Sequence, residues 1–178
     1  KISPASLSTY ISRGIKRGQI IQLKRGVYVM REFFDANKFK QSYIFYLANN
    51  LLLPSYVSLE SALQHYGLLT EAINVAITSL SIKLPRQFNG RLGMFEYKNI
   101  TTDLFCGFKT VQADFDFVIA APHKAIFDYL YYRTHHFKST FSQYILEDLR
   151  IDSDAISGNE KNLLNTLLKK YTSQTIQL

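Results

Sequence analysis

The first apolar pattern in the chain has the spacing of an α-helix. Three apolar residues lie four positions apart: Leu7, Ile11 and Ile15. Because an α-helix has about 3.6 residues per turn, this spacing predicts a helix over residues 5–17 with one apolar stripe. Ser3 followed by Pro4 is a typical helix start, and Gly18 is typical of the residue that follows a helix. Gly14 falls near the stripe, where we expect another helix to approach closely.

The next stretch changes from a helical to a strand-like pattern. Residues 20–23 and 27–30 are β-branched or aromatic runs on either side of Lys24, Arg25 and Gly26, which predicts a hairpin with two cations at its tip. A helix followed by a basic hairpin is the order of elements in a winged helix-turn-helix domain, whose recognition helix lies in the major groove. Such a domain also has one or two helices before the recognition helix, so we expect these to lie before Lys1.

The rest of the chain predicts strands grouped between helices. Helices are expected over residues 35–53, 59–66, 122–132, 139–149 and 159–171, the first capped by Asp35 and stopped by Pro54. Strands are expected over residues 73–78, 92–100, 105–111 and 115–120. This order favours an α+β fold. We expect an N-terminal winged helix, partly missing upstream, then an α+β domain with a small, mostly antiparallel sheet and C-terminal helices.

Charge divides the chain at about residue 31. Seven of the 21 Lys and Arg residues lie in residues 1–31, which contain no Asp or Glu, whereas residues 32–178 carry 14 cations and 14 anions. A basic segment ahead of a neutral body indicates a module that meets a polyanion. The predicted domains are therefore a DNA-binding portion over residues 1–31 and an effector domain over residues 32–178.

The face opposite the apolar stripe supplies the predicted DNA-binding residues of the helix. It carries small polar and cationic side chains, namely Ser6, Thr9, Ser12, Arg13, Lys16 and Arg17. Arginine and lysine can reach phosphates or the guanine edge, and short hydroxyl side chains allow close approach. Lys24 and Arg25 are expected to hold phosphates at the hairpin. About four to six neutralised phosphates predict a slope of about −4 to −5 for log affinity against log salt. A second basic group of Lys83, Arg86 and Arg91 either extends the DNA contact or is solvated, and we favour the second.

Three sequence blocks together resemble the AbiEi antitoxin family. The blocks are Lys24-Arg25-Gly26-Val27-Tyr28, then Leu53-Pro54-Ser55-Tyr56-Val57-Ser58-Leu59-Glu60-Ser61-Ala62-Leu63 with His65-Tyr66-Gly67-Leu68, and Ala120-Ala121-Pro122-His123-Lys124-Ala125-Ile126-Phe127-Asp128. The resemblance spans roughly residues 15–132 and has one departure, since His123 stands where the family commonly has Glu.

The AbiEi resemblance implies a function for both parts of the chain. Members of the family are bacterial transcriptional regulators of two-gene abortive-infection and toxin–antitoxin operons. The resemblance implies a winged helix that binds double-stranded DNA at its own promoter as a repressor. It also implies a C-terminal domain that contributes to antitoxicity against a nucleotidyltransferase-like toxin, with direct contact between the two left open. A protein that neutralises its toxin by binding it directly is one alternative.

A metal-dependent nuclease is the enzymatic alternative. Glu96 and Lys98 have the Glu-x-Lys spacing of such enzymes on a predicted strand, and a second acid would have to come from Glu71, Asp114 or Asp116. The same two residues also fit the exposed positions of a half-buried strand. We therefore expect no enzyme and no catalytic residue.

Neither a metal site nor a cofactor site is expected. His135 and His136 are adjacent and would point apart on a helix, so they would not share an ion with His123, and Cys106 has no second cysteine as a partner.

Composition and hydropathy place the protein in the cytoplasm, away from membranes. A single cysteine excludes an internal disulfide, which fits a reducing compartment. No apolar run approaches the roughly 18 residues of a transmembrane helix, and the first residues show no signal-peptide pattern. We therefore expect a cytoplasmic protein with no membrane partner.

Overall fold

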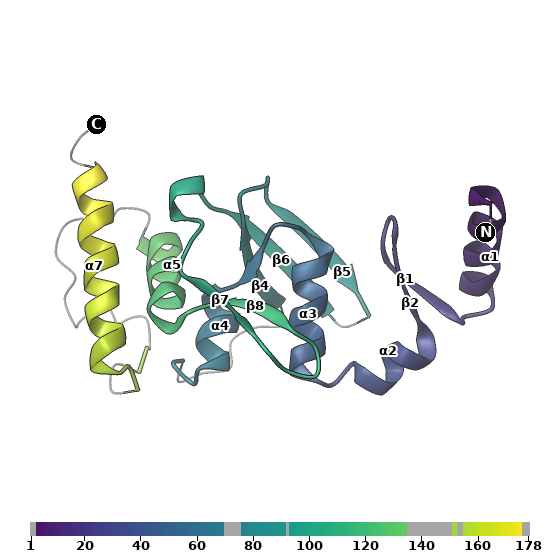
Figure 1. Cartoon of the computed structure of the whole chain (residues 1–178), viewed down its shortest axis with the longest axis horizontal. Coiled ribbons are helices and arrows are strands. Elements are labelled where there is room, and N and C mark those ends of the chain that lie inside the picture. Colours follow the sequence, from purple (N-terminus) through teal and green to yellow (C-terminus); the bar gives the residue numbers. More distant parts are fainter. Residues whose placement is uncertain (1–2, 70–75, 92, 135–150, 153–154, 176–178) are drawn as a thin grey trace.

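The computed structural model describes residues 3–69, 76–91, 93–134, 151–152 and 155–175 (Figure 1). The first elements are α1 (Pro4–Lys16), β1 (Ile20–Lys24), β2 (Val27–Met30), α2 (Arg31–Asn37) and α3 (Gln41–Leu51). They are followed by β3 (Tyr56–Val57), α4 (Leu59–His65), β4 (Ala76–Ser81), β5 (Arg86–Gly90) and β6 (Gly93–Asn99). The last elements are the short 3₁₀ turn η1 (Thr102–Leu104), β7 (Phe108–Val111), β8 (Phe117–Ala120), α5 (Pro122–Thr134) and α7 (Gly158–Thr175).

The fold is α+β, as the sequence predicts, but its main sheet is larger and more mixed than expected. The strand order is β5-β6-β4-β3-β8-β7. β4 and β6 are parallel, as are β3 and β8, and the other three neighbouring pairs are antiparallel. The sequence analysis missed β5 because most of its residues are exposed and it lacks an alternating pattern. Its strand conformation depends on pairing with β6.

The predicted helix over residues 35–53 is two helices, and this prediction was wrong. α2 ends at Asn37 and α3 begins at Gln41, so the chain turns between them. Asp35 lies inside α2 and pairs with Lys38 at 2.9 Å instead of capping a helix. The turn allows Phe34 of α2 to pack beside Tyr43 of α3, with ring centroids 6.4 Å apart and both side chains buried.

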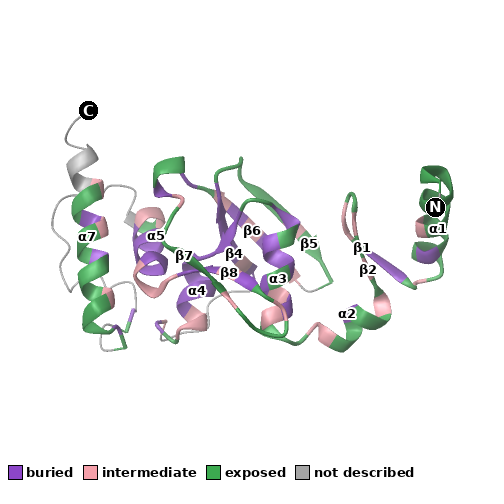
Figure 2. Ribbon diagram, viewed as in Figure 1, coloured by how far each residue is buried: buried purple, intermediate pink, exposed green. Residues whose placement is uncertain are grey.

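Polar contacts fix α3 against the sheet at two points. The Tyr97 hydroxyl of β6 donates a hydrogen bond to the Ala48 carbonyl at 2.5 Å. The Asn49 side-chain amide donates a hydrogen bond to the Val118 carbonyl of β8 at 3.1 Å and accepts one from the Val118 backbone N–H at 2.7 Å. Figure 2 shows the buried residues concentrated in the sheet and in α3, α4 and α5. A buried side-chain amide with both groups satisfied favours one packing arrangement over others.

A buried ion pair on α5 accepts hydrogen bonds from the end of β3. Lys124 and Asp128 pair one turn apart on α5, and both side chains are fully buried. Asp128 also accepts hydrogen bonds from the Ser58 hydroxyl at 2.7 Å and from the Tyr56 hydroxyl at 3.1 Å. Burial raises the pKa of the Asp128 carboxyl, while the Lys124 ammonium and the two hydroxyl donors act in the opposite direction. The two hydrogen bonds to Asp128 therefore hold two distant parts of the chain together.

Ser58 starts α4 without capping it through its side chain. The Ser58 hydroxyl donates to Asp128, and Leu59 takes a left-handed backbone conformation with φ of 55°. Thr78 of β4 holds this start, since its hydroxyl donates to the Ser58 carbonyl at 2.8 Å and its backbone N–H donates to the Ser61 hydroxyl at 2.9 Å. A left-handed non-glycine residue costs about 1–3 kcal/mol, so the surrounding hydrogen bonds must maintain it.

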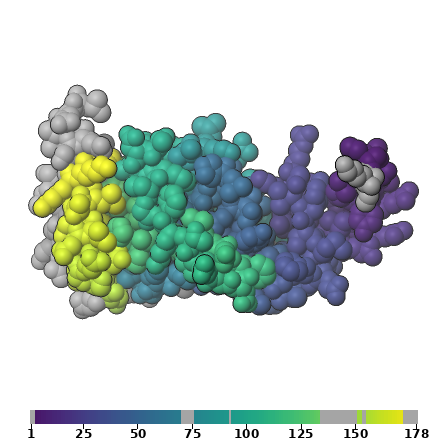
Figure 3. Space-filling view, in the orientation of Figure 1, coloured from purple at the N-terminus to yellow at the C-terminus, as the bar shows by residue number. Residues whose placement is uncertain are grey.

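At His123, the residue that differs from the AbiEi pattern, a carboxylate of α7 lies at the start of α5. Glu160 accepts the His123 backbone N–H at 2.9 Å, and its carboxylate lies 2.6 Å from the His123 Nδ1. A negative charge near a helix N-terminus is stabilising. α7 packs beside α5 at the end of the molecule opposite α1 (Figures 1 and 3), where Leu164 and Leu168 are buried. The predicted helix over residues 139–149 lies outside the described residues.

The N-terminal elements share the core of the larger domain. Ile21 of β1 belongs to the same buried cluster as Phe34 and the sheet residues. The Lys24 ammonium donates to the Leu51 carbonyl at the end of α3 at 2.5 Å. The hairpin therefore packs against the larger domain, and α1 lies on its far side (Figure 1).

Gly14 permits the contact between α1 and β1. It is buried, and a Cβ built there would lie 2.5 Å from Cδ1 of Ile20. The close neighbour expected from the sequence was a helix, and the structure has the first residue of β1 instead. The approach is closer than packed carbon atoms allow.

Replacement of Gly14 by Ala is expected to loosen α1 from the hairpin. Overpacking of this kind costs about 1–3 kcal/mol. Amide hydrogen exchange of α1 checks this, and faster exchange confined to α1 and β1 is the expected result. The double variant Gly14→Ala/Ile20→Val removes the Cδ1 atom but keeps the Cγ1 position, 2.9 Å from the new Cβ, so it should recover only part of the lost protection. Unchanged exchange in Gly14→Ala would contradict the packing described here.

Candidate nucleic-acid interface

α1 begins and ends where the sequence predicts. The Ser6 backbone N–H donates to the Ser3 hydroxyl at 3.2 Å, so Ser3 caps the helix and Pro4 is its first residue. Gly18 follows the helix with φ of 73°, a left-handed conformation that glycine adopts without strain. The helix is 13 residues long, which at 1.5 Å per residue is about 20 Å.

The predicted binding face of α1 is open to solvent. Each of the six predicted residues on this helix is exposed: Ser6, Thr9, Ser12, Arg13, Lys16 and Arg17. Two of the three hydroxyls already make local contacts, because Thr9 donates to the Ala5 carbonyl at 3.0 Å and the Ser6 and Ser3 hydroxyls lie 2.9 Å apart. The structure therefore leaves Ser12 and the three cations as the most available groups on this face.

The cations of this face have no acidic partner among the described residues. The acids that form ion pairs among the described residues are Asp35, Glu60, Asp114, Asp128 and Glu160, and none of them pairs with a residue of α1. By contrast, Lys38 and Lys40 of the larger domain are paired with Asp35 and Asp114. The positive charge of α1 is therefore not neutralised by the described acids.

Two cations of the first 31 residues hold the structure together instead. Lys24, predicted to bind phosphate, is directed at the Leu51 carbonyl, and its ammonium also lies 5.9 Å from the centre of the Phe88 ring. Arg31 donates to the Gly18 carbonyl just after α1. Arg25 stands exposed at the hairpin tip beside Gly26. The hairpin is thus formed as predicted, but of its two tip cations only Arg25 faces solvent freely.

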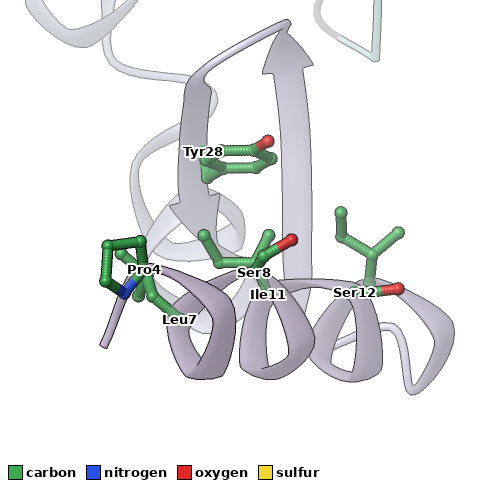
Figure 4. A pocket seen from close by; sticks show the side chains of 7 residues that line it. Pro4, Leu7, Ser8, Ile11, Ser12 and Tyr28 are labelled. Carbon is green, nitrogen blue, oxygen red and sulfur yellow. The ribbon is translucent and has the colours of Figure 1, made fainter. Parts of the chain in front are cut away.

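The apolar stripe of α1 is open on one flank of the helix. Leu7 is 48% exposed and Ile15 is 38% exposed, although both belong to the stripe. Together with Ile11 and with Tyr28 of β2 they border a groove of about 360 Å³ (Figure 4). None of the described residues that line this flank is charged.

The other flank of α1 forms a smaller, basic cavity. It encloses about 140 Å³ between the helix and the adjoining ends of β1 and β2. The lining residues are Tyr10, Arg13, Gly14, Arg17, Gln19, Ile20 and Met30. Sequence reasoning assigned Arg13 and Arg17 but missed Tyr10 and Gln19. Tyr10 precedes the arginines by three and seven residues, so helical spacing could have found it, whereas the position of Gln19 depends on the turn after α1.

The sheet order separates the residues of the nuclease alternative. Glu96 lies on β6, while Asp114 and Asp116 lie between β7 and β8, and β4 and β3 stand between β6 and β8. At about 4.8 Å per strand these acids are too far apart to share an ion with Glu96. Lys98 lies 5.3 Å from the Tyr132 ring centre. Glu71, His135 and His136 lie outside the described residues.

The second basic group is exposed. Lys83, Arg86 and Arg91 all face solvent, and Arg91 borders a small hollow shared with Leu23 of β1. Within the described ranges, no three His, Cys, Asp or Glu side chains gather closely enough to hold a metal ion.

Comparisons with known proteins give no relative. No protein-family model, curated protein or solved structure matches this chain. None of the helices in the described part is long and apolar enough to cross a membrane. The site must therefore be judged by its own geometry.

Proposed function

We propose that this protein is a transcriptional repressor that binds double-stranded DNA at its own promoter through a winged helix. α1 is the recognition helix, and the β1–β2 hairpin is the wing. The observation that carries the proposal is the face of α1, where exposed cations that have no acidic partner among the described residues flank small polar residues.

The dimensions and chemistry of this face suit the major groove. The groove is about 12 Å wide and admits one α-helix. Ser12, Thr9 and Ala5 present short side chains, so the helix axis can approach the base edges. Arg13, Lys16 and Arg17 extend beyond them and can reach guanine edges or phosphates. Arg25 at the wing tip adds one further backbone contact.

We further propose that the repressor is the antitoxin of a toxin–antitoxin operon. The three sequence blocks that resemble the AbiEi family support this assignment. Two of them supply the buried residues Tyr56, Ser58, Lys124 and Asp128, which meet in one network. The larger domain would then counteract a nucleotidyltransferase-like toxin, either by binding the toxin or without direct contact.

DNA binding is expected to weaken with salt at a slope of about −3 to −4. The slope is about −0.9 for each neutralised phosphate, and four cations of the interface are free to make such contacts: Arg13, Lys16, Arg17 and Arg25. This is shallower than the sequence alone predicts, because Lys24 is held by Leu51. Fluorescence anisotropy with 30-bp duplexes that tile the DNA upstream of the gene, measured over a range of KCl concentrations, gives the slope.

A composition-matched scrambled duplex is the control for specific binding. One upstream duplex should bind at least about a thousandfold more tightly than the scrambled one, as is usual for specific regulators. Equal affinity for all duplexes would contradict a promoter-specific repressor. The absence of binding at low salt would contradict the whole proposal.

A further inference from the structure

The two flanks of α1 differ in chemistry. One flank consists of Pro4, Leu7, Ser8, Ile11, Ser12 and Ile15 and borders the uncharged groove beside Tyr28 (Figure 4). The other consists of Tyr10, Arg13, Gly14 and Arg17, spaced at three, four and seven residues, and borders the basic cavity. The hairpin lies between the two, because it contacts the helix at Gly14. A ligand that α1 binds therefore meets a different surface on each side.

The basic cavity has the donors that an anion requires. Arg13, Arg17, Gln19 and Tyr10 line it, and the side chain of each carries hydrogen-bond donors. No acidic side chain lines it, and neither arginine has an ion-pair partner among the described residues. Its volume of about 140 Å³ is several times the roughly 30 Å³ that one water molecule occupies in the liquid. A tetrahedral oxyanion with two or three ligated oxygens suits such a space and such donors.

We propose that this cavity is a binding site for one phosphodiester group of the DNA backbone, held by Arg13, Arg17 and Gln19. The inference rests on the proposed DNA-binding function and goes beyond it, because it assigns a new residue, Gln19, and a direction. When a helix lies in the major groove, its two flanks face the two phosphate strands. The strand along the cavity flank is clamped, and the strand along the groove flank is not. The recognition helix is therefore tilted toward the clamped strand.

The cavity also links DNA binding to the hairpin. Gln19 is the residue between Gly18 and β1, and its backbone N–H donates to the Gly14 carbonyl at 2.9 Å. Its carbonyl accepts the Arg31 backbone N–H at 2.8 Å. Both ends of the hairpin are thereby fixed next to the phosphate. A clamped phosphate would set the orientation of the wing as well as that of the helix.

Two variants of equal net charge test the proposal. Gln19→Glu places a carboxylate at the cavity, and Ser8→Glu places one on the uncharged flank of the same helix. Both residues are exposed, so neither change should affect folding, which the thermal midpoint of each variant checks. In anisotropy titrations of the full chain with the upstream duplex, Gln19→Glu should lose at least about tenfold in affinity and about one unit of salt slope. Ser8→Glu also brings a carboxylate toward a phosphate strand, but at no cavity that holds a phosphate, so it should lose clearly less affinity than Gln19→Glu and keep the salt slope of the parent.

The outcomes separate this proposal from the proposed function. Equal losses in Gln19→Glu and Ser8→Glu, with a parent that binds DNA, would overturn the cavity site and leave the repressor assignment standing. A parent protein that binds none of the duplexes would overturn both the cavity site and the repressor assignment. A third measurement follows the Gln19 side-chain amide signals of ¹⁵N-labelled protein during addition of duplex or of inorganic phosphate. Shifts with the duplex support the site, and shifts with inorganic phosphate alone would assign it to a free anion and overturn the proposal.

Discussion

Replacement of Arg13 and Arg17 by Ala together is expected to weaken binding to the upstream duplex about a hundredfold. Each arginine that contacts a phosphate or a base edge contributes about 1–3 kcal/mol, and 1.4 kcal/mol corresponds to a tenfold change. Both side chains are exposed and make no ion pair among the described residues, so their removal should leave the fold intact. The salt slope should also become shallower by about two units. Anisotropy titrations at three KCl concentrations measure both quantities.

The matched control is the double variant Lys38→Ala/Lys40→Ala. It also removes two positive charges, so the two double variants have the same net charge. Lys38 and Lys40 are paired with Asp35 and Asp114 at 2.9 Å each, and they lie outside the proposed interface. The control should retain affinity within about threefold. If the two double variants lost equal affinity, binding would depend on net charge, and the assignment of α1 as the recognition helix would be wrong.

Replacement of Asp128 by Asn is expected to lower the free energy of unfolding by about 3–5 kcal/mol. The change leaves the Lys124 ammonium fully buried without its counter-charge, and breaking a buried pair has a cost of this size. Ser58 and Tyr56 would also lose a charged acceptor. This loss is a large share of the total stability of a domain, which is about 5–15 kcal/mol. Urea denaturation followed by circular dichroism measures it.

The double variant Lys124→Met/Asp128→Asn distinguishes an unpaired charge from lost packing. It removes both charges, so it should recover part of the stability that Asp128→Asn loses. Asp116→Asn, on an exposed side chain, should change stability by less than about 0.5 kcal/mol. A double variant as unstable as Asp128→Asn would show that the buried charge is not the cause.

Two of the three blocks that resemble the AbiEi family contribute mainly to the core. Tyr56 and Ser58 of one block and Lys124 and Asp128 of another are joined in one buried network, although Tyr56 and Ser58 precede Asp128 by 72 and 70 residues. Asp128 is fully buried and is bound by Lys124, Ser58 and Tyr56, so its role is structural. At His123, where the chain departs from the family pattern, Glu160 of α7 brings a carboxylate to the start of α5. The buried pair makes these residues structural, so we do not expect them to contact a ligand.

Local chemistry explains which elements the sequence predicted well. α1 has a capping serine, a proline at its first position and a glycine after its end, and each acts within a few residues. The hairpin has apolar strands on both sides of a short loop that contains Gly26. The elements that the sequence did not predict correctly depend on contacts with residues that are not their neighbours in the chain. The helix over residues 35–53 breaks where Phe34 packs on Tyr43, and β5 is a strand because β6 lies beside it.

The sequence by itself determined the α+β class, the basic face of α1 and the cationic hairpin that follows it, because helical spacing, caps and turn residues are local properties. Only the tertiary structure decided which cations remain free. It directs Lys24 to Leu51 and Arg31 to Gly18, and it leaves Arg13, Lys16, Arg17 and Arg25 in solvent. It also brings Gln19 beside the two arginines of α1. A charge pattern fixes how many cations a segment carries, but their partners depend on which carbonyls and carboxylates the folded chain places within reach.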